Sequence, residues 1–169
     1  MLVSLIINEQ HIAVEKNKTV LEAAQAHGIV IPTLCHHKDL TPVGSCRLCI
    51  VEINNLHGQV PACNLPVADG MAIHTETLAL IESRRSILAL LLQNYYDSGY
   101  TLRADQPTEF DYWVSYYAAK PLDGIVPKPR YPVNGDPNPF IWVDLNKCIL
   151  CTRCVRACEE IQGRHVWGV

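Results

Sequence analysis

Eight cysteines are the residues whose type and spacing point most directly to chemistry. They form two groups of four, and none lies between Cys63 and Cys148. The spacing is C-x10-C-x2-C-x13-C in the first group and C-x2-C-x2-C-x3-C in the second. Thiolates are soft ligands that select zinc or iron–sulfur clusters. The first group consists of Cys35, Cys46, Cys49 and Cys63, and the second of Cys148, Cys151, Cys154 and Cys158.

Disulfide bonds are a competing use of an even number of cysteines. An apolar stretch opens the chain without a basic region before it, so we expect no secretory signal. Thiols stay reduced in proteins that are not exported. The most apolar run, residues 87–92, is far shorter than the ~20 residues needed to span a bilayer. We therefore predict a cytoplasmic protein without a membrane span, whose cysteines bind metal.

The second group has the spacing of a bacterial ferredoxin, in which the fourth cysteine serves the other cluster of a pair. Zinc sites usually consist of two separated C-x2-C pairs instead. The spacing predicts that Cys148, Cys151 and Cys154 bind one [4Fe–4S] cluster and that Cys158 binds a second. Residues beyond Val169 would then complete both clusters. The alternative is that Cys158 bends back and completes the first cluster.

The first group does not fit the C-x4-C-x2-C spacing of plant-type [2Fe–2S] proteins directly, because its first gap has ten residues. Gly44 and Ser45, just before the second cysteine, nevertheless allow the backbone to approach a cluster and direct N–H groups at sulfur. Four cysteines suffice as ligands, so His36 and His37 are taken as loop residues. A zinc-binding structural module remains the alternative. The predicted [2Fe–2S] ligands are Cys35, Cys46, Cys49 and Cys63.

The elements around the first group predict a β-grasp domain. Thr19 is a plausible N-cap with Glu22 completing a capping box, and Gly28 would end the helix. The cysteine loop follows this helix, and Cys49 runs straight into a strand. Hairpin, helix, cluster loop, strand and fourth cysteine follow one another in that order. The expected strands are residues 2–7, 12–15, 50–53 and 71–75.

The remaining sequence predicts a long helix and then a connecting segment rich in proline and aromatic residues, which favours irregular structure. Arg84 and Arg85 are expected on the solvated face of that helix. The predicted fold class is α+β: a β-grasp [2Fe–2S] ferredoxin domain (1–76), the helix and connecting segment (77–139) and a partial bacterial-type [4Fe–4S] ferredoxin domain (140–169). The expected buried stripe of the helix is Leu78, Ile81, Ile87, Leu88, Leu91 and Leu92.

Three stretches, residues 31–36, 44–49 and 61–63, resemble the N-terminal module of the large iron–sulfur subunit of NADH:quinone oxidoreductase. NAD-reducing hydrogenases and NAD-dependent formate dehydrogenases share that module. Residues 143–160 resemble formate dehydrogenase catalytic subunits most closely. Family members commonly bind a further cluster through one histidine and three cysteines, but residues 92–100 contain neither residue type. Some formate dehydrogenase subunits also lack that cluster.

The resemblance implies an electron-transfer module of a multi-cluster oxidoreductase. Its expected partners are a flavin/NADH-binding diaphorase subunit and a molybdenum- or tungsten-pterin site outside this chain, so no catalytic residue is expected here. The alternative is a relay subunit of a NAD-reducing hydrogenase or quinone reductase. Nucleic acid is not an expected partner, because the net charge is −3 and basic proteins are typical of that class.

Overall fold

The structure is a computed structural model that describes residues 1–97, 107–132 and 143–168. The chain divides into two units, residues 1–84 together with 151–169, and residues 85–150. Parts of the predicted connecting segment, and the first residues of the predicted third domain, lie outside the described residues.

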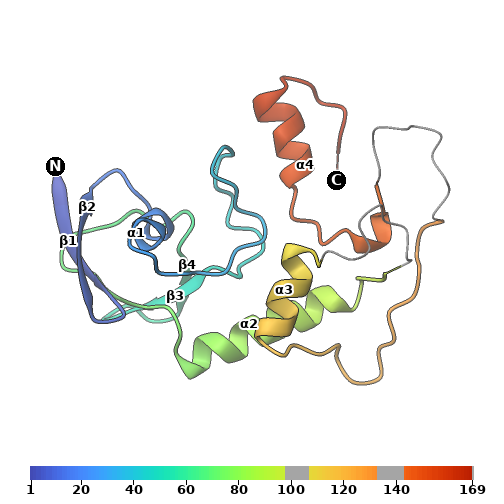
Figure 1. Cartoon of the computed structure of the whole chain (residues 1–169), viewed down its shortest axis with the longest axis horizontal. Coiled ribbons are helices and arrows are strands. Elements are labelled where there is room, and N and C mark those ends of the chain that lie inside the picture. The colour runs from blue at the N-terminus through green and yellow to red at the C-terminus, as the bar shows by residue number, and fades with distance from the viewer. Residues whose placement is uncertain (98–106, 133–142, 169) are drawn as a thin grey trace. The chain divides into compact units, whose positions relative to one another are not determined.

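A five-stranded mixed sheet forms the frame of the first unit (Figure 1), with the order β2-β1-β5-β3-β4. β1 and β5 are parallel, and the other neighbours are antiparallel. Asn8 and Glu9 join β1 to β2 and both have positive φ angles, as in the type I′ turns that suit two-residue hairpins. The strands are β1 (Leu2–Ile7), β2 (Gln10–Glu15), β3 (Ile50–Ile53), β4 (Gln59–Pro61) and β5 (Ala72–His74).

The core of this unit lies between the sheet and helix α1 (Val20–Ala26). Val3, Leu5 and Ile7 alternate with more exposed residues along β1, as expected for a strand with one buried face. They pack in one cluster with the buried residues of α1. The expected hairpin, helix and strands are confirmed, whereas the short strand β4 has no counterpart among them.

Helix α1 begins and ends where its sequence signals predict. The Thr19 hydroxyl accepts a hydrogen bond from the Glu22 N–H, and the Glu22 carboxylate accepts one from the Thr19 N–H at 2.8 Å. This capping box satisfies two N–H groups that a helix start otherwise leaves unpaired. Gly28, with a φ of 72°, follows the end of the helix in the left-handed conformation that glycine adopts at little cost.

Helix α2 (Leu78–Leu92) corrects the expected placement of its side chains. Leu78 is 81% exposed, whereas Leu80, Arg84 and Leu88 are 0% exposed. These three residues are four positions apart and therefore share one helix face. The prediction that Arg84 is solvated is wrong, because an arginine lies in the middle of the buried stripe; Arg85 is exposed as expected.

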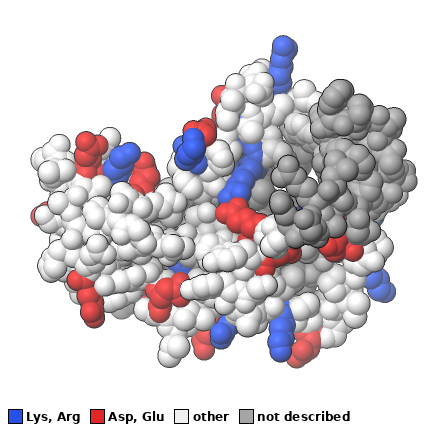
Figure 2. All heavy atoms as spheres, viewed as in Figure 1, with Lys and Arg blue, Asp and Glu red and all other residues white. Residues whose placement is uncertain are grey.

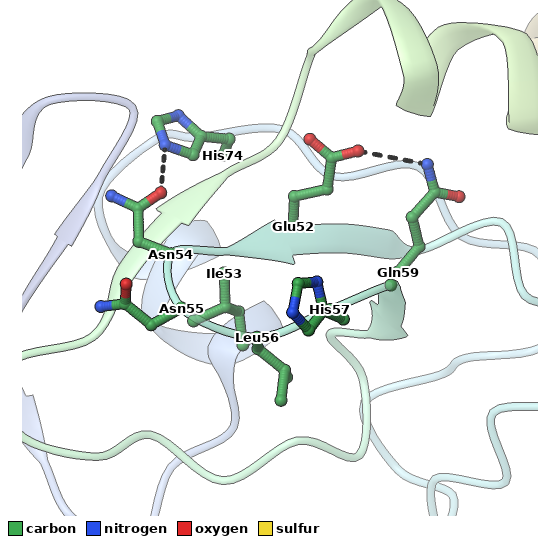
Figure 3. A pocket seen from close by; sticks show the side chains of 9 residues that line it. Glu52, Ile53, Asn54, Asn55, Leu56, His57, Gln59 and His74 are labelled. Carbon is green, nitrogen blue, oxygen red and sulfur yellow. Dashed lines mark hydrogen bonds between the residues drawn. The ribbon is translucent and has the colours of Figure 1, made fainter.

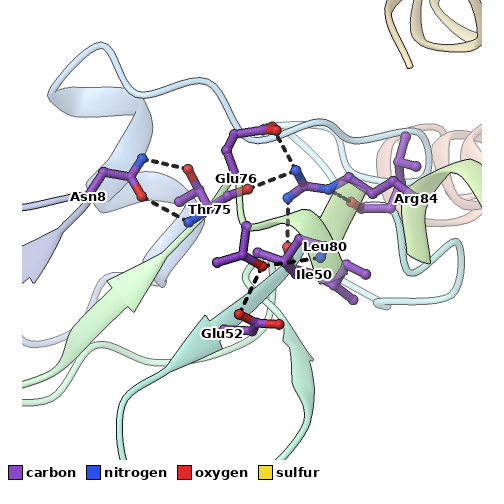
Figure 4. A network of polar contacts seen from close by, with 9 residues as sticks. Asn8, Ile50, Glu52, Thr75, Glu76, Leu80 and Arg84 are labelled. Carbon is purple, nitrogen blue, oxygen red and sulfur yellow. Dashed lines mark hydrogen bonds and ion pairs between the residues drawn. The ribbon is translucent and has the colours of Figure 1, made fainter. Parts of the chain in front are cut away.

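The buried Arg84 guanidinium connects segments that are far apart in the sequence (Figure 4). It donates to the carbonyls of Leu48 at 3.2 Å, Ile50 at 2.7 Å and Thr75 at 2.8 Å. It also forms an ion pair with Glu76 at 2.7 Å. Buried charges are tolerated when they are paired and hydrogen-bonded in this way. Arg84 thus joins the start of β3 to the end of β5.

The second unit contains a helix where irregular structure is expected, namely α3 (Glu109–Tyr116). Thr108 and Asp111 form a capping box at its start. Phe110 and Trp113 of this helix are buried, and the Phe110 ring contacts Tyr95 with 4.7 Å between centroids. The prediction of an irregular segment is wrong here, because a local cap and buried aromatic residues outweigh the proline-rich composition.

The C-terminal part of the first unit is helical and comprises α4 (Arg153–Arg156) and the π-helical turn η2 (Ala157–Ile161). None of the helices formed by the described residues is long and apolar enough to cross a bilayer. Basic and acidic side chains are interspersed over the face in Figure 2. No concentrated basic surface of the kind that nucleic acids require is seen among the described residues of that face.

We expect Arg84→Met to lower the free energy of unfolding by roughly 3 kcal/mol, because it leaves buried carbonyls and a carboxylate without their donor. Thermal unfolding of the chain, followed by circular dichroism, measures the loss. Arg85→Met is the matched control, since Arg85 is exposed and donates to one carbonyl, that of Tyr117. Equal losses in the two variants would contradict a special role of Arg84.

Glu22→Gln tests the cap at the start of α1. Burial tends to raise the pKa of Glu22, but the Thr19 N–H and Lys18 lower it by more, so its pKa lies below its ordinary value. A lowered pKa stabilises the fold above the unfolded-state pKa of about 4.3. The stability difference between wild type and variant should therefore be present at neutral pH and vanish as the pH falls through the folded-state pKa. A difference that persists at low pH would contradict this account.

Candidate iron–sulfur centres

The structure brings the four cysteines of the first group together from three loops. Cys35 lies in the loop after α1, Cys46 and Cys49 precede β3, and Cys63 follows β4. Cys35 and Cys49 are 1% exposed, Cys63 is 0% exposed and Cys46 is partly exposed. Cys49 and Cys63 belong to the hydrophobic core cluster. The group therefore has a buried end in the core and an end nearer to solvent at Cys46.

The four sulfurs are arranged as two pairs. Cys35 and Cys46 form the first pair, in which the backbone N–H of each residue donates to the Sγ of the other at 3.5 Å. Cys49 and Cys63 form the second pair, since each thiol shifts the pKa of the other. Charge interactions extend from Cys35 to both members of the second pair, so the two pairs are neighbours.

One thiol of each pair has a lowered pKa, which favours its thiolate form. The hydrogen bond from Cys46 holds the pKa of Cys35 at about 4, and the bond from Cys49 lowers the pKa of Cys63. The same two bonds, together with burial, raise the pKa of Cys46 and Cys49. Metal binding releases the protons of such thiols, because thiolate is the ligand form.

Backbone N–H groups of the loop that precedes Cys46 act on two of the thiols. The Gly44 N–H lowers the pKa of Cys63, and the N–H and hydroxyl of Ser45 lower the pKa of Cys35. Gly44 has a φ of 63°, and a Cβ there would lie 3.0 Å from the Asn64 side chain. The backbone thus passes close to its neighbours at Gly44, as the sequence predicts, and the direction of N–H groups at a cluster stays a prediction.

Cys63 is also held by the start of helix α1. The N–H groups of Val20 and Leu21, which a helix start cannot satisfy internally, donate to the carbonyls of Leu65 at 2.9 Å and Ala62 at 3.0 Å. These carbonyls lie on both sides of Cys63 in the sequence. The helix that covers the sheet thus fixes the fourth cysteine of the group.

Each C-x2-C interval contains one residue with a left-handed backbone. These are Arg47 at φ 58°, Leu150 at φ 54° and Thr152 at φ 58°. Such conformations are uncommon for residues other than glycine, and for a β-branched threonine they are outliers. Alternation with right-handed residues turns successive N–H groups to one side, which creates the concave backbone found at anion and iron–sulfur sites.

In the second unit, Asn146 organises the chain just before Cys148. Asn146 is 1% exposed, and its side-chain oxygen accepts from the N–H groups of Arg130 at 2.8 Å and Tyr131 at 3.0 Å. Its side-chain nitrogen donates to the Tyr131 carbonyl, and its own carbonyl accepts from the Tyr96 N–H at 2.9 Å. Sequence reasoning did not find Asn146, since polar burial has no local signal.

The other cysteines of the second group belong to the first unit. Cys151 and Cys158 are half-buried, whereas Cys154 is exposed on α4. The Cys158 thiol donates to the Arg164 carbonyl at 2.8 Å. The helix continues through Cys158 as a π-helical turn, a local form that is frequent at functional sites.

No three histidine, cysteine or acidic side chains within the described ranges are grouped so that they could hold a single metal ion. Four cysteines shared by two irons give two ligands per iron, and four shared by a cubane give one. A [2Fe–2S] or [4Fe–4S] cluster therefore does not require three protein ligands around one metal ion. His36 lies beside Cys35 but its buried Nδ1 has no hydrogen-bond partner among the described residues, and burial lowers its pKa.

A separate hollow lies at the turn between β3 and β4 (Figure 3). Its polar side chains bond to one another, Gln59 to Glu52 at 3.3 Å and His74 to Asn54 at 3.1 Å. Its lining contains no cysteine. This hollow is therefore distinct from the cysteine groups.

Comparison with known proteins agrees with this arrangement. Residues 1–78 match a 2Fe-2S iron–sulfur cluster binding domain, and residues 138–169 match the ferredoxin-like domain of NADH-quinone oxidoreductase subunit 3. The predicted α+β fold with these two kinds of ferredoxin domain is thereby confirmed, and the cofactors are iron–sulfur clusters.

Curated relatives match nearly the whole chain. An NADH-quinone oxidoreductase subunit of Rhizobium meliloti (strain 1021) is 38% identical over 99% of this chain and 20% of the relative. The alpha subunit of an NADPH-Fe(3+) oxidoreductase of Geobacter sulfurreducens is 40% identical over 96% of this chain and 19% of the relative. The chain thus spans about a fifth of the length of these relatives.

A crystal structure of NAD+-reducing [NiFe]-hydrogenase in the H2-reduced state is also similar. The TM-score is 0.74 and the identity 31%, over 94% of this chain and 67% of the hydrogenase chain. The chain therefore carries a 2Fe-2S iron–sulfur cluster binding domain and a ferredoxin-like domain of the NADH-quinone oxidoreductase type, and over nearly its whole length it is similar to subunits of NADH-quinone and NADPH-Fe(3+) oxidoreductases.

Proposed function

We propose that this chain is an electron-transfer module in which Cys35, Cys46, Cys49 and Cys63 hold a [2Fe–2S] cluster. The observation that carries the proposal is the arrangement of the four cysteines, three of them buried, as two neighbouring pairs. Two irons with two cysteine ligands each fit such pairs. The bound cluster supplies reversible uptake of one electron at a time.

The residues of the chain hold this site and set its properties. The apolar core keeps water from Cys49 and Cys63. The N–H groups of Gly44 and Ser45 lower the pKa of the Cys63 and Cys35 thiols. N–H groups near the sulfurs stabilise negative charge and so favour the reduced state. No proton has to move in this function, which agrees with the assignment of no catalytic residue to the chain.

Zinc is the competing occupant of the first group. A structural zinc ion needs four thiolates at ≈ 2.3 Å from one centre. Within the parts of the chain that the structure describes, three suitable side chains do not gather around one ion position. The paired arrangement therefore favours two metal centres over one.

For the second group, we assign Cys148, Cys151 and Cys154 to one [4Fe–4S] cluster and Cys158 to a second cluster. Support comes from the ferredoxin-like match over residues 138–169 and from the left-handed residues inside both C-x2-C intervals. Further cysteines of the full-length protein would complete both clusters.

The relatives place such modules in NAD(P)H-linked oxidoreductases. The proposed role here is to relay electrons between a flavin/NADH-binding subunit and a second redox site. The narrower assignment, a formate dehydrogenase with a molybdenum- or tungsten-pterin site, rests on the resemblance of residues 143–160. A relay in a NAD-reducing hydrogenase or quinone reductase is the second candidate, and the hydrogenase similarity favours it. Pterin and metal analysis of the purified complex separates the two.

Cys49→Ser tests the first site. Loss of one buried ligand should remove about two irons per chain relative to wild type and abolish the [2Fe–2S] EPR signal of the reduced protein. Ser45→Ala is the matched control, because it removes a donor to Cys35 but no ligand. It should keep the iron and the signal and lower the midpoint potential, since a hydrogen bond that favours the reduced state is lost. Stoichiometric zinc without iron after anaerobic reconstitution would refute the assignment.

Cys158→Ala tests the division of the second group. In the full-length protein, the change should damage one [4Fe–4S] cluster and leave the cluster bound by Cys148, Cys151 and Cys154 intact. Mössbauer spectra quantify both clusters. If Cys158→Ala instead removes the cluster assigned to Cys148, Cys151 and Cys154 and affects no other cluster, Cys158 completes the first cubane.

A further inference from the structure

A buried arginine connects the two cysteine groups within the first unit. Arg156 lies on α4 between Cys154 and Cys158 and is 6% exposed. Its guanidinium donates to the Thr41 carbonyl at 2.7 Å and to the Cys35 carbonyl. The second cysteine group is thereby bonded directly to a residue that the proposed function assigns as a [2Fe–2S] ligand.

Residues 35–41 are called here the Cys35 loop. A second residue of the same helical segment also forms a hydrogen bond with this loop. The Glu160 carboxylate accepts a hydrogen bond from the Thr41 N–H at 2.7 Å. That bond lowers the pKa of Glu160, and the nearby Arg156 charge acts in the same direction. Thr41 thus has its N–H held by Glu160 and its carbonyl held by Arg156. The Cys35 loop contains no helix or strand of its own, so these bonds fix it from outside.

The two buried arginines near the first site differ in their partners. Arg84 donates to carbonyls beside Cys49 but is also ion-paired with Glu76 at 2.7 Å. Arg156 donates to two carbonyl oxygens and, at 3.2 Å, to the Thr152 hydroxyl. The Glu160 carboxylate lies near enough to offset part of the Arg156 charge. The charge that remains acts from a buried position, where it is screened less than at the surface. Its field at Cys35 favours a more negative neighbouring centre.

We propose that Arg156 is a positioning residue that fastens the second cysteine group onto the Cys35 loop and raises the reduction potential of the [2Fe–2S] site through its fixed charge. The proposal rests on the proposed function for its redox part only. The fastening itself depends on the contacts of Thr41 with Arg156 and Glu160 and is independent of which metal the cysteines bind.

The fastening is tested by hydrogen–deuterium exchange at Thr41 in the intact oxidoreductase that contains this chain. Arg156→Gln and Glu160→Ala should each speed exchange of the Thr41 amide about tenfold or more. The first variant loses the hydrogen bond to the Thr41 carbonyl, and the second loses the acceptor of the Thr41 N–H. Arg164→Gln is the matched control: Arg164 is an exposed cation in the same segment, and its hydrogen bonds to Cys158 use its backbone. Thr41 exchange in Arg156→Gln equal to that in Arg164→Gln would overturn the fastening.

The charge effect is tested by EPR-monitored redox titration of the same variants. Arg156→Gln should shift the one-electron reduction equilibrium of the [2Fe–2S] site about tenfold toward the oxidised form, which is 59 mV. Glu160→Ala loosens the loop without removing a cation, so it should not lower the potential. A loss of potential in Glu160→Ala equal to that in Arg156→Gln would show that loosening, not charge, is the cause and would overturn the redox part.

If the Arg156→Gln protein does not fold or does not assemble into the oxidoreductase, Arg156→Lys provides the test instead. Lysine keeps the charge but lacks the fork that reaches two carbonyls. Faster Thr41 exchange with a potential near that of wild type supports the proposal, and exchange equal to wild type overturns it. Iron analysis separates these results from failure of the proposed function: an iron-free first site with a protected Thr41 amide would refute the [2Fe–2S] assignment and leave the fastening standing.

Discussion

Four sulfur atoms that carry negative charge when they bind metal lie at the edge of an apolar core, and the surrounding structure compensates that charge. Burying an unpaired charge is costly. Backbone N–H groups of residues 44 and 45 lower the pKa of two of the thiols, Cys63 and Cys35. Two buried guanidinium groups, Arg84 and Arg156, bond to the backbone of the ligand loops. These interactions explain why the loops that carry the cysteines adopt one arrangement without regular secondary structure.

The regular elements serve as supports for these loops. The start of α1 holds the carbonyls on both sides of Cys63, and Arg84 of α2 holds those on both sides of Cys49. A helix start and a long basic side chain are suited to this task, because both offer N–H donors that would otherwise need water. The core, the sheet and the candidate site are therefore stabilised by the same contacts.

Local signals predicted much of this architecture. The capping box at Thr19, the left-handed Gly28 and the strand directly after Cys49 are all set by neighbouring residues, and each was found from the sequence. Both cysteine groups are predicted as ligand sets because ligand spacing is itself visible in the sequence, and their assignment to clusters stays a prediction. The Thr108–Asp111 capping box would have revealed α3 if the composition of the surrounding segment had been given less weight.

The features that sequence reasoning missed depend on distant contacts. From the sequence, Arg84 is expected in solvent. It is buried because the carbonyls of Leu48, Ile50 and Thr75, which lie in other segments, accept its hydrogen bonds. Asn146 and Arg156 are buried polar residues for the same reason, and the backbone groups that their side chains bond lie 15 to 121 positions away in the sequence. The pairing of Cys35 with Cys46 and of Cys49 with Cys63 also follows from the fold and not from the spacing.

The most direct test of the central claim is a Mössbauer spectrum of iron-57-enriched chain in which the four cysteines of the second group are replaced by alanine. Two metal centres with two cysteine ligands each predict two ferric irons that are magnetically coupled to a diamagnetic state in the oxidised protein. After one-electron reduction, one ferric and one ferrous iron should be present. A single iron or zinc ion bound by Cys35, Cys46, Cys49 and Cys63 would contradict the account.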